Sequence, residues 1–251
     1  MCGRFVSASS PDELAQYFGA EPPDSILEPS YNVAPTADVY ALVESEGHRK
    51  IDVMRWGLIP FWAKDMKIGS KMTNARSETL FEKPAFRSAV KRRRCLIPVD
   101  GFYEWAVIPN QKRKQPYYVH RGDGDRLVLA GLWEAWSIPN TSDKAEIGAE
   151  VITSCTIITC EPNDVMSRIH SRMPVVVAPQ DWDRWIRPTG NPTALGELLK
   201  PAPNELLALH PVSTAVNTVR NNSKALIEPD TEQPSTSPQQ IGLFGTGEGV
   251  S

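Results

Sequence analysis

Residues 95–105 read Cys95-Leu96-Ile97-Pro98-Val99-Asp100-Gly101-Phe102-Tyr103-Glu104-Trp105, and this stretch decides the fold. It begins as an apolar strand, turns at Asp100-Gly101, and continues as a second strand that carries Glu104 between large aromatic residues. Similar short β-rich runs, which would continue a meander, occupy residues 39–43, 51–56, 117–119, 127–133 and 151–159. Short strands separated by turn signals predict an α+β single domain with an antiparallel or mixed β-barrel-like core.

Short helices are expected to flank this core. Ser10 is followed by Pro11 and two acidic residues, which predicts a helix start, and we expect that helix to run to about Phe18. A second helix is expected from about Phe81 to the basic run 91–94, and two more at 180–186 and 193–199. A basic run at a helix end is typical of a solvated face that complements the dipole. Contact with phosphate is the alternative.

The composition excludes a protein that spans a membrane with helices and one that carries a global basic field. Hydrophobic residues make up 41% of the 251 residues, and no apolar run reaches the roughly 18 residues that a spanning helix needs. The net charge is −3, and three of the 30 acidic residues follow residue 229, so the body holds 27 acidic against 27 basic residues. Any nucleic-acid surface must therefore be a local patch. We expect a cytoplasmic, nucleoid-associated monomer.

The four cysteines are Cys2, Cys95, Cys155 and Cys160. In the cytosol they should be thiols and not a disulfide framework. Cys155 and Cys160 are five residues apart in an apolar run, a spacing that matches no zinc template. We interpret these two and Cys95 as small buried hydrophobic residues, and we expect neither a metal nor a cofactor.

Cys2 differs from the other cysteines because it follows the initiator methionine in Met1-Cys2-Gly3-Arg4-Phe5. Met1 is normally removed before a small residue, so the mature chain should begin with an α-amine and a thiol on one carbon. The amine, with a pKa of about 7.7–8.0, is far more often neutral at pH 7 than a lysine amine is. Two chemistries suit this start: acyl transfer by the thiol, and capture of an aldehyde as an imine that the thiol closes into a thiazolidine ring.

Several polar and aromatic residues look out of place in their context. Glu104 lies between aromatic residues, and strand alternation allows it to point into a pocket or to solvent. If it points inward, burial would raise its pKa toward that of a general acid or base. His170 lies in a polar loop where it could transfer protons or fill a structural role. Trp56 and Trp62, followed by two lysines, could form a base-stacking wedge or belong to the core.

Seven blocks in order carry a resemblance to a known family, and they are Met1-Cys2-Gly3-Arg4-Phe5, Tyr31-Asn32-Val33-Ala34-Pro35, Trp56-Gly57, Asn74-Ala75-Arg76-Ser77-Glu78-Thr79, Gly101-Phe102-Tyr103-Glu104-Trp105, Ile169-His170-Ser171-Arg172-Met173-Pro174 and His210-Pro211-Val212-Ser213. This order resembles the SRAP family, the abasic-site processing proteins also called SOS response-associated peptidases. The resemblance implies an SRAP domain over residues 2–228 and a separate tail over residues 229–251.

The resemblance implies a sensor of abasic sites in single-stranded DNA that links itself to them through a thiazolidine at Cys2, shielding the lesion during replication-coupled repair. The implied catalytic residues are Cys2, Asn74, Glu104 and His170: Asn74 orients the reacting groups, and Glu104 and His170 form an acid/base pair. The implied DNA contacts are Arg4, Pro35, Trp62, Asn74, Arg76, Thr159 and Arg172. The arginines would bind phosphates, and Trp62 with Pro35 would form an apolar wedge.

Further activities and two rival functions stay open at this stage. An imine on the sugar permits β-elimination, so strand cleavage of the lyase type is expected as a side reaction. The peptidase label would mean release of residues before Cys2, and ordinary removal of Met1 suffices here. The rivals are an N-terminal-nucleophile amidohydrolase, since glutamine amidotransferases also begin Met-Cys-Gly, and a non-covalent reader of modified or damaged DNA.

The tail after Asp230 is rich in Pro, Ser, Thr, Gln and Gly, which predicts disorder. Residues 240–244 read Gln240-Ile241-Gly242-Leu243-Phe244 and resemble the short peptides that dock on DNA sliding clamps. Gln240, Leu243 and Phe244 would be the clamp contacts, and a chance match is the alternative.

Overall fold

Five strands close into a barrel that forms one half of the molecule. The computed structural model describes residues 2–137, 151–187 and 191–230. Around the barrel, β10 pairs with β4, β4 with β3, β3 with β6, β6 with β9, and β9 again with β10. The β10–β4 pair is parallel and the others are antiparallel. These strands span β3 Asp38–Ser45, β4 His48–Trp56, β6 Arg94–Val99, β9 Leu127–Ser137 and β10 Val151–Cys160.

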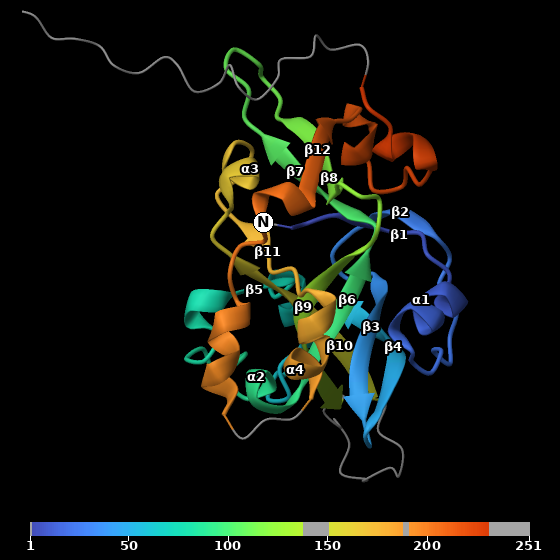
Figure 1. Ribbon diagram of the computed structural model, residues 1–251, viewed down its shortest axis with the longest axis vertical. Helices are drawn as coiled ribbons and strands as arrows, with labels where there is room; N and C mark the ends of the chain where they lie inside the picture. The colour runs from blue at the N-terminus through green and yellow to red at the C-terminus, as the bar shows by residue number, and fades with distance from the viewer. Residues whose placement is uncertain (1, 138–150, 188–190, 231–251) are drawn as a thin grey trace, which may run out of the picture.

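A second, five-stranded antiparallel sheet lies above the barrel in Figure 1, in the order β12-β8-β7-β1-β2. Its strands are β1 Phe5–Ser7, β2 Ser30–Val33, β7 Gly101–Ala106, β8 Gln115–Arg121 and β12 Leu207–Pro211. Two short strands, β5 Asn74–Arg76 and β11 Met173–Pro174, add to the end of β10 that reaches this sheet. The predicted α+β class with a mixed barrel is therefore confirmed, and its barrel and sheet meet near the amino terminus.

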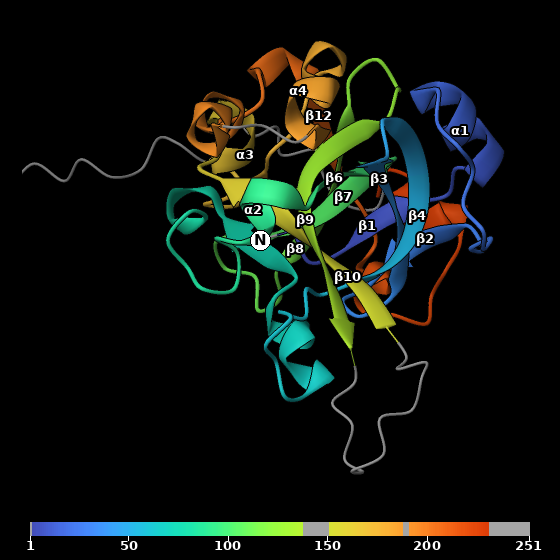
Figure 2. The same cartoon turned by 90° about the horizontal axis from the view of Figure 1, so that it is seen from below.

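The helices are short and surround the two sheets. Figure 2 shows α1 on one side of the barrel, and α2 and α4 on the other. The α-helices are α1 Pro11–Phe18, α2 Ala89–Arg92, α3 Asp164–Ser167 and α4 Trp182–Ile186. The 3₁₀ helices are η1 Met66–Lys71, η2 Ser77–Thr79, η3 Pro179–Asp181, η4 Pro192–Leu198, η5 Asn204–Leu206, η6 Thr214–Asn217 and η7 Lys224–Ile227. Within the described ranges, no helix is long and apolar enough to cross a membrane.

The predicted helix from Phe81 to Arg94 is wrong, because only α2 is helical there. Pro84 interrupts the segment: it lacks an N–H and disfavours the helical conformation of the residue before it. The basic run is also not one solvated face. Arg94 is 1% exposed at the start of β6, and its guanidinium donates to the carbonyl oxygens of Val90, Trp185 and Arg187. Arg94 therefore serves the core and presents no charge to a phosphate.

The turn at Asp100-Gly101 joins two sheets and not the two strands of a hairpin. β6 pairs with barrel strands, whereas β7 pairs with β1 and β8 of the other sheet, so the expected meander is wrong at this point. The Asp100 carboxylate fixes the crossing by accepting hydrogen bonds from Ala8 N at 2.7 Å and from Ser9 Oγ at 3.0 Å. The turn at Asp100-Gly101 is therefore the crossing point between the barrel and the five-stranded sheet.

Replacement of Gly101 by alanine is expected to lower the free energy of unfolding by about 1–3 kcal/mol, the usual effect of overpacking. A Cβ at this position would lie 2.5 Å from the ring of Tyr118. Gly196→Ala is the matched control, because a Cβ there meets no atom within 4 Å. Urea unfolding of both variants measures the difference, and equal stabilities would contradict the packing argument.

Candidate active site

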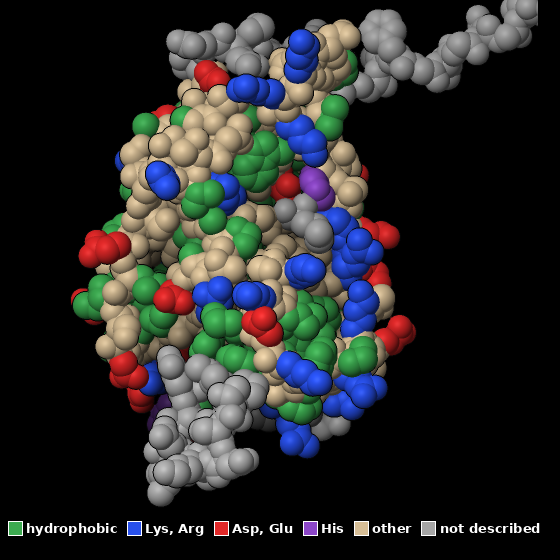
Figure 3. Space-filling model, turned by 180° about the vertical axis from the view of Figure 1, so that it is seen from behind, with side chains coloured by type: hydrophobic (Ala, Val, Ile, Leu, Met, Phe, Trp, Pro, Cys, Tyr) green, Lys and Arg blue, Asp and Glu red, His purple; other side chains and the backbone are tan. Residues whose placement is uncertain are grey.

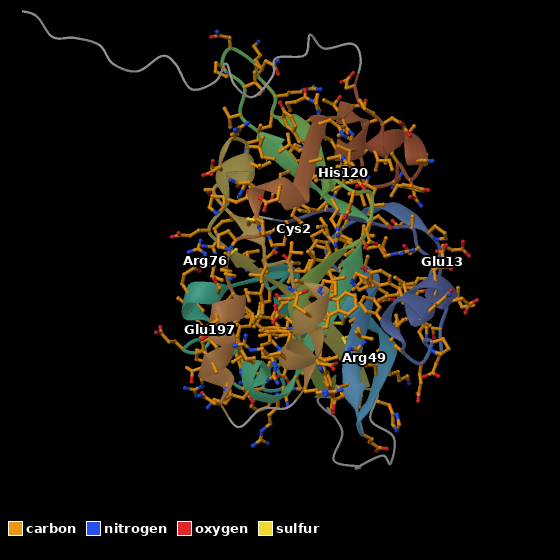
Figure 4. The ribbon with its side chains drawn as sticks, in the orientation of Figure 1. Cys2, Glu13, Arg49, Arg76, His120 and Glu197 are labelled. Carbon is orange, nitrogen blue, oxygen red and sulfur yellow. The ribbon has the colours of Figure 1, made fainter. Side chains whose placement is uncertain are left out.

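Cys2 lies where the barrel meets the five-stranded sheet (Figure 4). It precedes β1, which is held between β2 and β7, and Arg4 O accepts a hydrogen bond from Tyr103 N at 2.9 Å. The Cys2 side chain is fully buried in the main hydrophobic cluster. The start of the chain is thus built into a sheet, which holds the thiol in one place.

Asn74 contacts Cys2 directly. Its Nδ2 donates to Cys2 O at 2.9 Å and to Thr73 Oγ1 at 3.2 Å. The segment is pinned because Trp56 Nε1 and Ile157 N both donate to Thr73 O. Asn74 Oδ1 is buried and has no hydrogen-bond partner among the described residues. Buried acceptors are rarely left in this state, so this oxygen suits a donor on a bound molecule or a reacting group.

Glu104 points inward from β7. Alternation along the strand puts it on the same face as Phe102, which belongs to the main cluster, while Tyr103 faces the opposite side. Glu104 is only 2% exposed. Burial raises the pKa of its carboxyl, and the nearby imidazole of His170 acts against that rise. The question that the sequence left open is answered: the carboxyl lies inside.

His170 faces Glu104 from the connection between α3 and β11. Its Nε2 lies 3.9 Å from Glu104 Oε2, and its side chain is 25% exposed. His170 Nδ1 lies 3.0 Å from the backbone N and 3.2 Å from the backbone O of Arg172, which holds the ring with Nε2 on the side of Glu104. The imidazole therefore connects the buried carboxyl with the surface.

The Cys2 thiol is not set up as a free thiolate. Burial raises the pKa of the thiol, the charge of Glu104 raises it further, and a hydrogen bond with the backbone of Arg4 acts the other way. The charge of Glu104 thus acts on Cys2, Asn74 bonds to Cys2, and His170 lies next to Glu104. The structure brings the four predicted catalytic residues together from four separate parts of the chain.

The predicted DNA contacts divide into exposed and buried residues. Pro35 and Arg76 are exposed, and Arg76 lies at the edge of the molecule beyond Cys2 (Figure 4). Trp62 is 48% exposed beside a 610 Å³ pocket that is also lined by Lys64, Lys67 and Lys71. Figure 3 shows Lys and Arg side chains gathered mainly over the centre and lower half of one face. Because these side chains are exposed, a nucleic acid can contact them without a rearrangement of the protein.

Three other predicted DNA contacts are buried or form hydrogen bonds with other residues of the protein. Thr159 is fully buried, so the expected contact of its side chain with DNA does not fit the structure. Arg172 donates to both carboxylate oxygens of Glu78 and to Thr159 O. Arg4 is partly buried, and its Nη1 donates to Asn32 Oδ1 at 2.7 Å and to Val216 O at 2.9 Å.

Sequence reasoning gave no role to Glu78 or Asn32, although both lie in the blocks that carry the resemblance. Asn32 is buried and donates from Nδ2 to three carbonyl oxygens, those of Val216, Thr218 and Asn221. Glu78 is the partner of Arg172. Their position inside those blocks indicated that they matter. The sequence around a carboxylate or an amide does not show which residue it will hydrogen-bond.

Comparison with known proteins decides the family. A model of the family described as SOS response associated peptidase (SRAP) matches residues 1–219. The chain belongs to the SRAP family. SRAP relatives include the abasic site processing protein YoaM of Bacillus subtilis, which is 41% identical over 91% of this chain and 98% of its own length. The abasic site processing protein YoqW of the same organism is 39% identical over 91% of this chain and 99% of its own length.

The similarity extends to a vertebrate protein and to solved structures. The abasic site processing protein HMCES of Xenopus tropicalis is 31% identical to this SRAP chain, over 89% of the chain and 76% of HMCES. The crystal structure of a protein from Bacteroides thetaiotaomicron superposes with a TM-score of 0.80 at 25% identity, covering 91% of this chain and all of that protein. The barrel and sheet described above are therefore the SRAP fold.

Proposed function

We propose that this SRAP protein senses abasic sites in single-stranded DNA and crosslinks to them through Cys2 after Met1 is removed, shielding the lesion. The contact of Asn74 with Cys2, beside the buried Glu104–His170 pair, carries the proposal. The abasic-site processing named for YoaM, YoqW and HMCES supports the same substrate. An abasic deoxyribose exists partly as an open-chain aldehyde, which is the electrophile that a 1,2-aminothiol captures.

The proposed reaction balances without an oxidant or a reductant. The Cys2 amine attacks the C1′ aldehyde carbon, and the resulting carbinolamine loses water to give an imine. The thiol sulfur then adds to the imine carbon while its proton passes to the nitrogen, which closes the thiazolidine. One water is lost overall. Because burial and Glu104 keep the thiol protonated near neutral pH, the amine reacts first and the thiol second.

Each neighbouring residue has a proposed task in this reaction. Asn74 holds Cys2 through its carbonyl and offers Oδ1 to a donor on the sugar or the terminus. His170 presents its Nε2 proton to the ring oxygen of the sugar, which promotes opening to the aldehyde. Glu104 exchanges protons with the amine and the thiol, a task that a raised pKa suits near neutral pH. An imine that loses the 3′-phosphate by β-elimination would give the lyase side reaction.

The exposed residues are proposed to hold the DNA. Arg76 would bind a phosphate next to the lesion, and Trp62 with Pro35 would stack against or separate bases. Lys64, Lys67 and Lys71 around the Trp62 pocket supply positive charge for the strand. The clamp contacts proposed for Gln240, Leu243 and Phe244 lie outside the described residues, as does nearly all of the tail, and they stay predictions.

The mature protein is expected to form a heat-stable adduct with single-stranded DNA that holds one abasic site. The adduct should be absent with intact DNA, and denaturing electrophoresis with mass analysis of the N-terminal peptide measures both. An amidohydrolase would ignore the DNA and hydrolyse a glutamine amide. A non-covalent reader would shift the DNA in a native gel and leave nothing bound after heating, and either result rejects the proposal.

A further inference from the structure

Glu78 and Arg172 form a bidentate ion pair beside the candidate active site. Arg172 Nη1 donates to Glu78 Oε1 at 2.6 Å, and Nη2 donates to Oε2 at 2.9 Å. The same Nη2 donates to Thr159 O at 2.6 Å. Glu78 lies in η2, directly after the strand of Asn74, and Thr159 lies in β10. Because such forks fix geometry as well as add energy, Arg172 is tied to both elements at once.

Arg172 in turn orients His170. The two residues share the short connection between α3 and β11, and the Arg172 backbone N–H donates to His170 Nδ1. A displaced Arg172 backbone would withdraw that donor. The imidazole would then be free to rotate, and its Nε2 would no longer face Glu104 consistently.

We propose that Glu78 is a positioning residue for the crosslinking reaction, which acts through Arg172 to fix the orientation of His170. The inference rests on the proposed function. It also gives Arg172 a structural role, because its Nη atoms donate to the carboxylate of Glu78 and the carbonyl of Thr159. The proposed effect of Glu78 on His170 passes through Arg172, which contacts both residues.

The rival role for Arg172 predicts a different result. If Arg172 left Glu78 to bind a phosphate, the carboxylate would compete with DNA. Removing its charge would then tighten binding and make the affinity more dependent on salt. A positioning role leaves affinity unchanged and slows the chemical step.

The test compares Glu78→Gln with the wild-type chain in two assays. The first is the single-turnover rate of crosslinking to abasic single-stranded DNA, and the second is the Kd for the same DNA with a tetrahydrofuran analogue that has no aldehyde. We expect the rate to fall about tenfold or more, as for a misplaced reacting group, with the Kd within about twofold. The ¹⁵N chemical shifts of the His170 ring should differ from those of the wild type.

Glu197→Gln is the matched control, because Glu197 is also an exposed partner of an arginine, at 2.7 Å from Arg184 Nη2, and it lies away from Cys2 (Figure 4). It should keep the wild-type rate. Arg172→Lys, which keeps the charge but loses the fork, should slow crosslinking as Glu78→Gln does. Wild-type rates in both site variants, or tighter DNA binding by Glu78→Gln, would overturn the inference. Failure of the wild type to crosslink would instead reject the proposed function.

Discussion

Replacement of Cys2 by alanine is expected to abolish the heat-stable adduct with abasic DNA. The amine remains, so an imine can still form, but no sulfur is present to close the ring. Imines hydrolyse on heating, and the expected product is DNA without protein. Borohydride, which reduces imines, should trap the intermediate in the variant. Denaturing electrophoresis with and without borohydride measures both species, and a stable adduct without reduction would refute the role of the thiol.

Cys2→Ser is the companion variant, because it keeps the size of the side chain and offers an oxygen in place of sulfur. It should also form a reversible imine and little stable adduct. Because the Cys2 side chain is fully buried, both changes alter packing, at a cost of about 1 kcal/mol for a buried group of this size. Thermal unfolding therefore accompanies the assay, and near-normal melting with no adduct assigns the loss to chemistry.

Glu104→Gln is expected to slow crosslinking by about 10²-fold or more, the usual loss when a general acid or base is removed. The amide has nearly the shape of the carboxyl, so binding of the tetrahydrofuran DNA should change little. The single-turnover rate against pH is the decisive measurement. In the wild type the rate should rise as pH passes the raised pKa of Glu104 and the carboxyl becomes a base. An unchanged rate and pH profile in the variant would remove Glu104 from the mechanism.

The same substitution should stabilise the protein at neutral pH. Burial raises the pKa of Glu104 above its unfolded value of about 4.3, so the folded state favours the protonated carboxyl. The contribution of Glu104 to stability is therefore fully present below about pH 4.3, and it is lost as pH rises through the folded pKa. Glutamine does not ionise. Urea unfolding should show a gain for Glu104→Gln at pH 7 that shrinks toward pH 4.

Local features of the fold were predictable because local sequence determines them. The first helix ends at Phe18 as expected, and its Ser10 cap forms the full capping box with Glu13. β3 and β4 are antiparallel neighbours, as the expected meander requires. The separation of β6 and β7 into two sheets was not predictable, because a turn dipeptide is compatible both with a hairpin and with a crossing between sheets. Buried Arg94 was hidden in a basic run for a similar reason: its carbonyl partners at Trp185 and Arg187 are distant in the sequence.

The candidate site was predictable as a set of residues and not as a set of contacts. The ordered blocks pointed to Cys2, Asn74, Glu104 and His170, but strand alternation alone could not decide the direction of Glu104. The Arg172–Glu78 pair shows the limit most clearly. An exposed-looking arginine in a loop predicts a phosphate contact equally well whether or not a carboxylate from another segment already occupies it.

The position of β1 inside its sheet has a mechanical consequence. β1 lies between β2 and β7 and is antiparallel to both. A pull applied at the first residue acts along this strand, so the hydrogen bonds on its two sides bear the load in shear and must break together. A covalent link to DNA at Cys2 would therefore resist pulling. A motor that pulls on the DNA–protein adduct would have to break the hydrogen bonds on both sides of β1 before the domain unfolds.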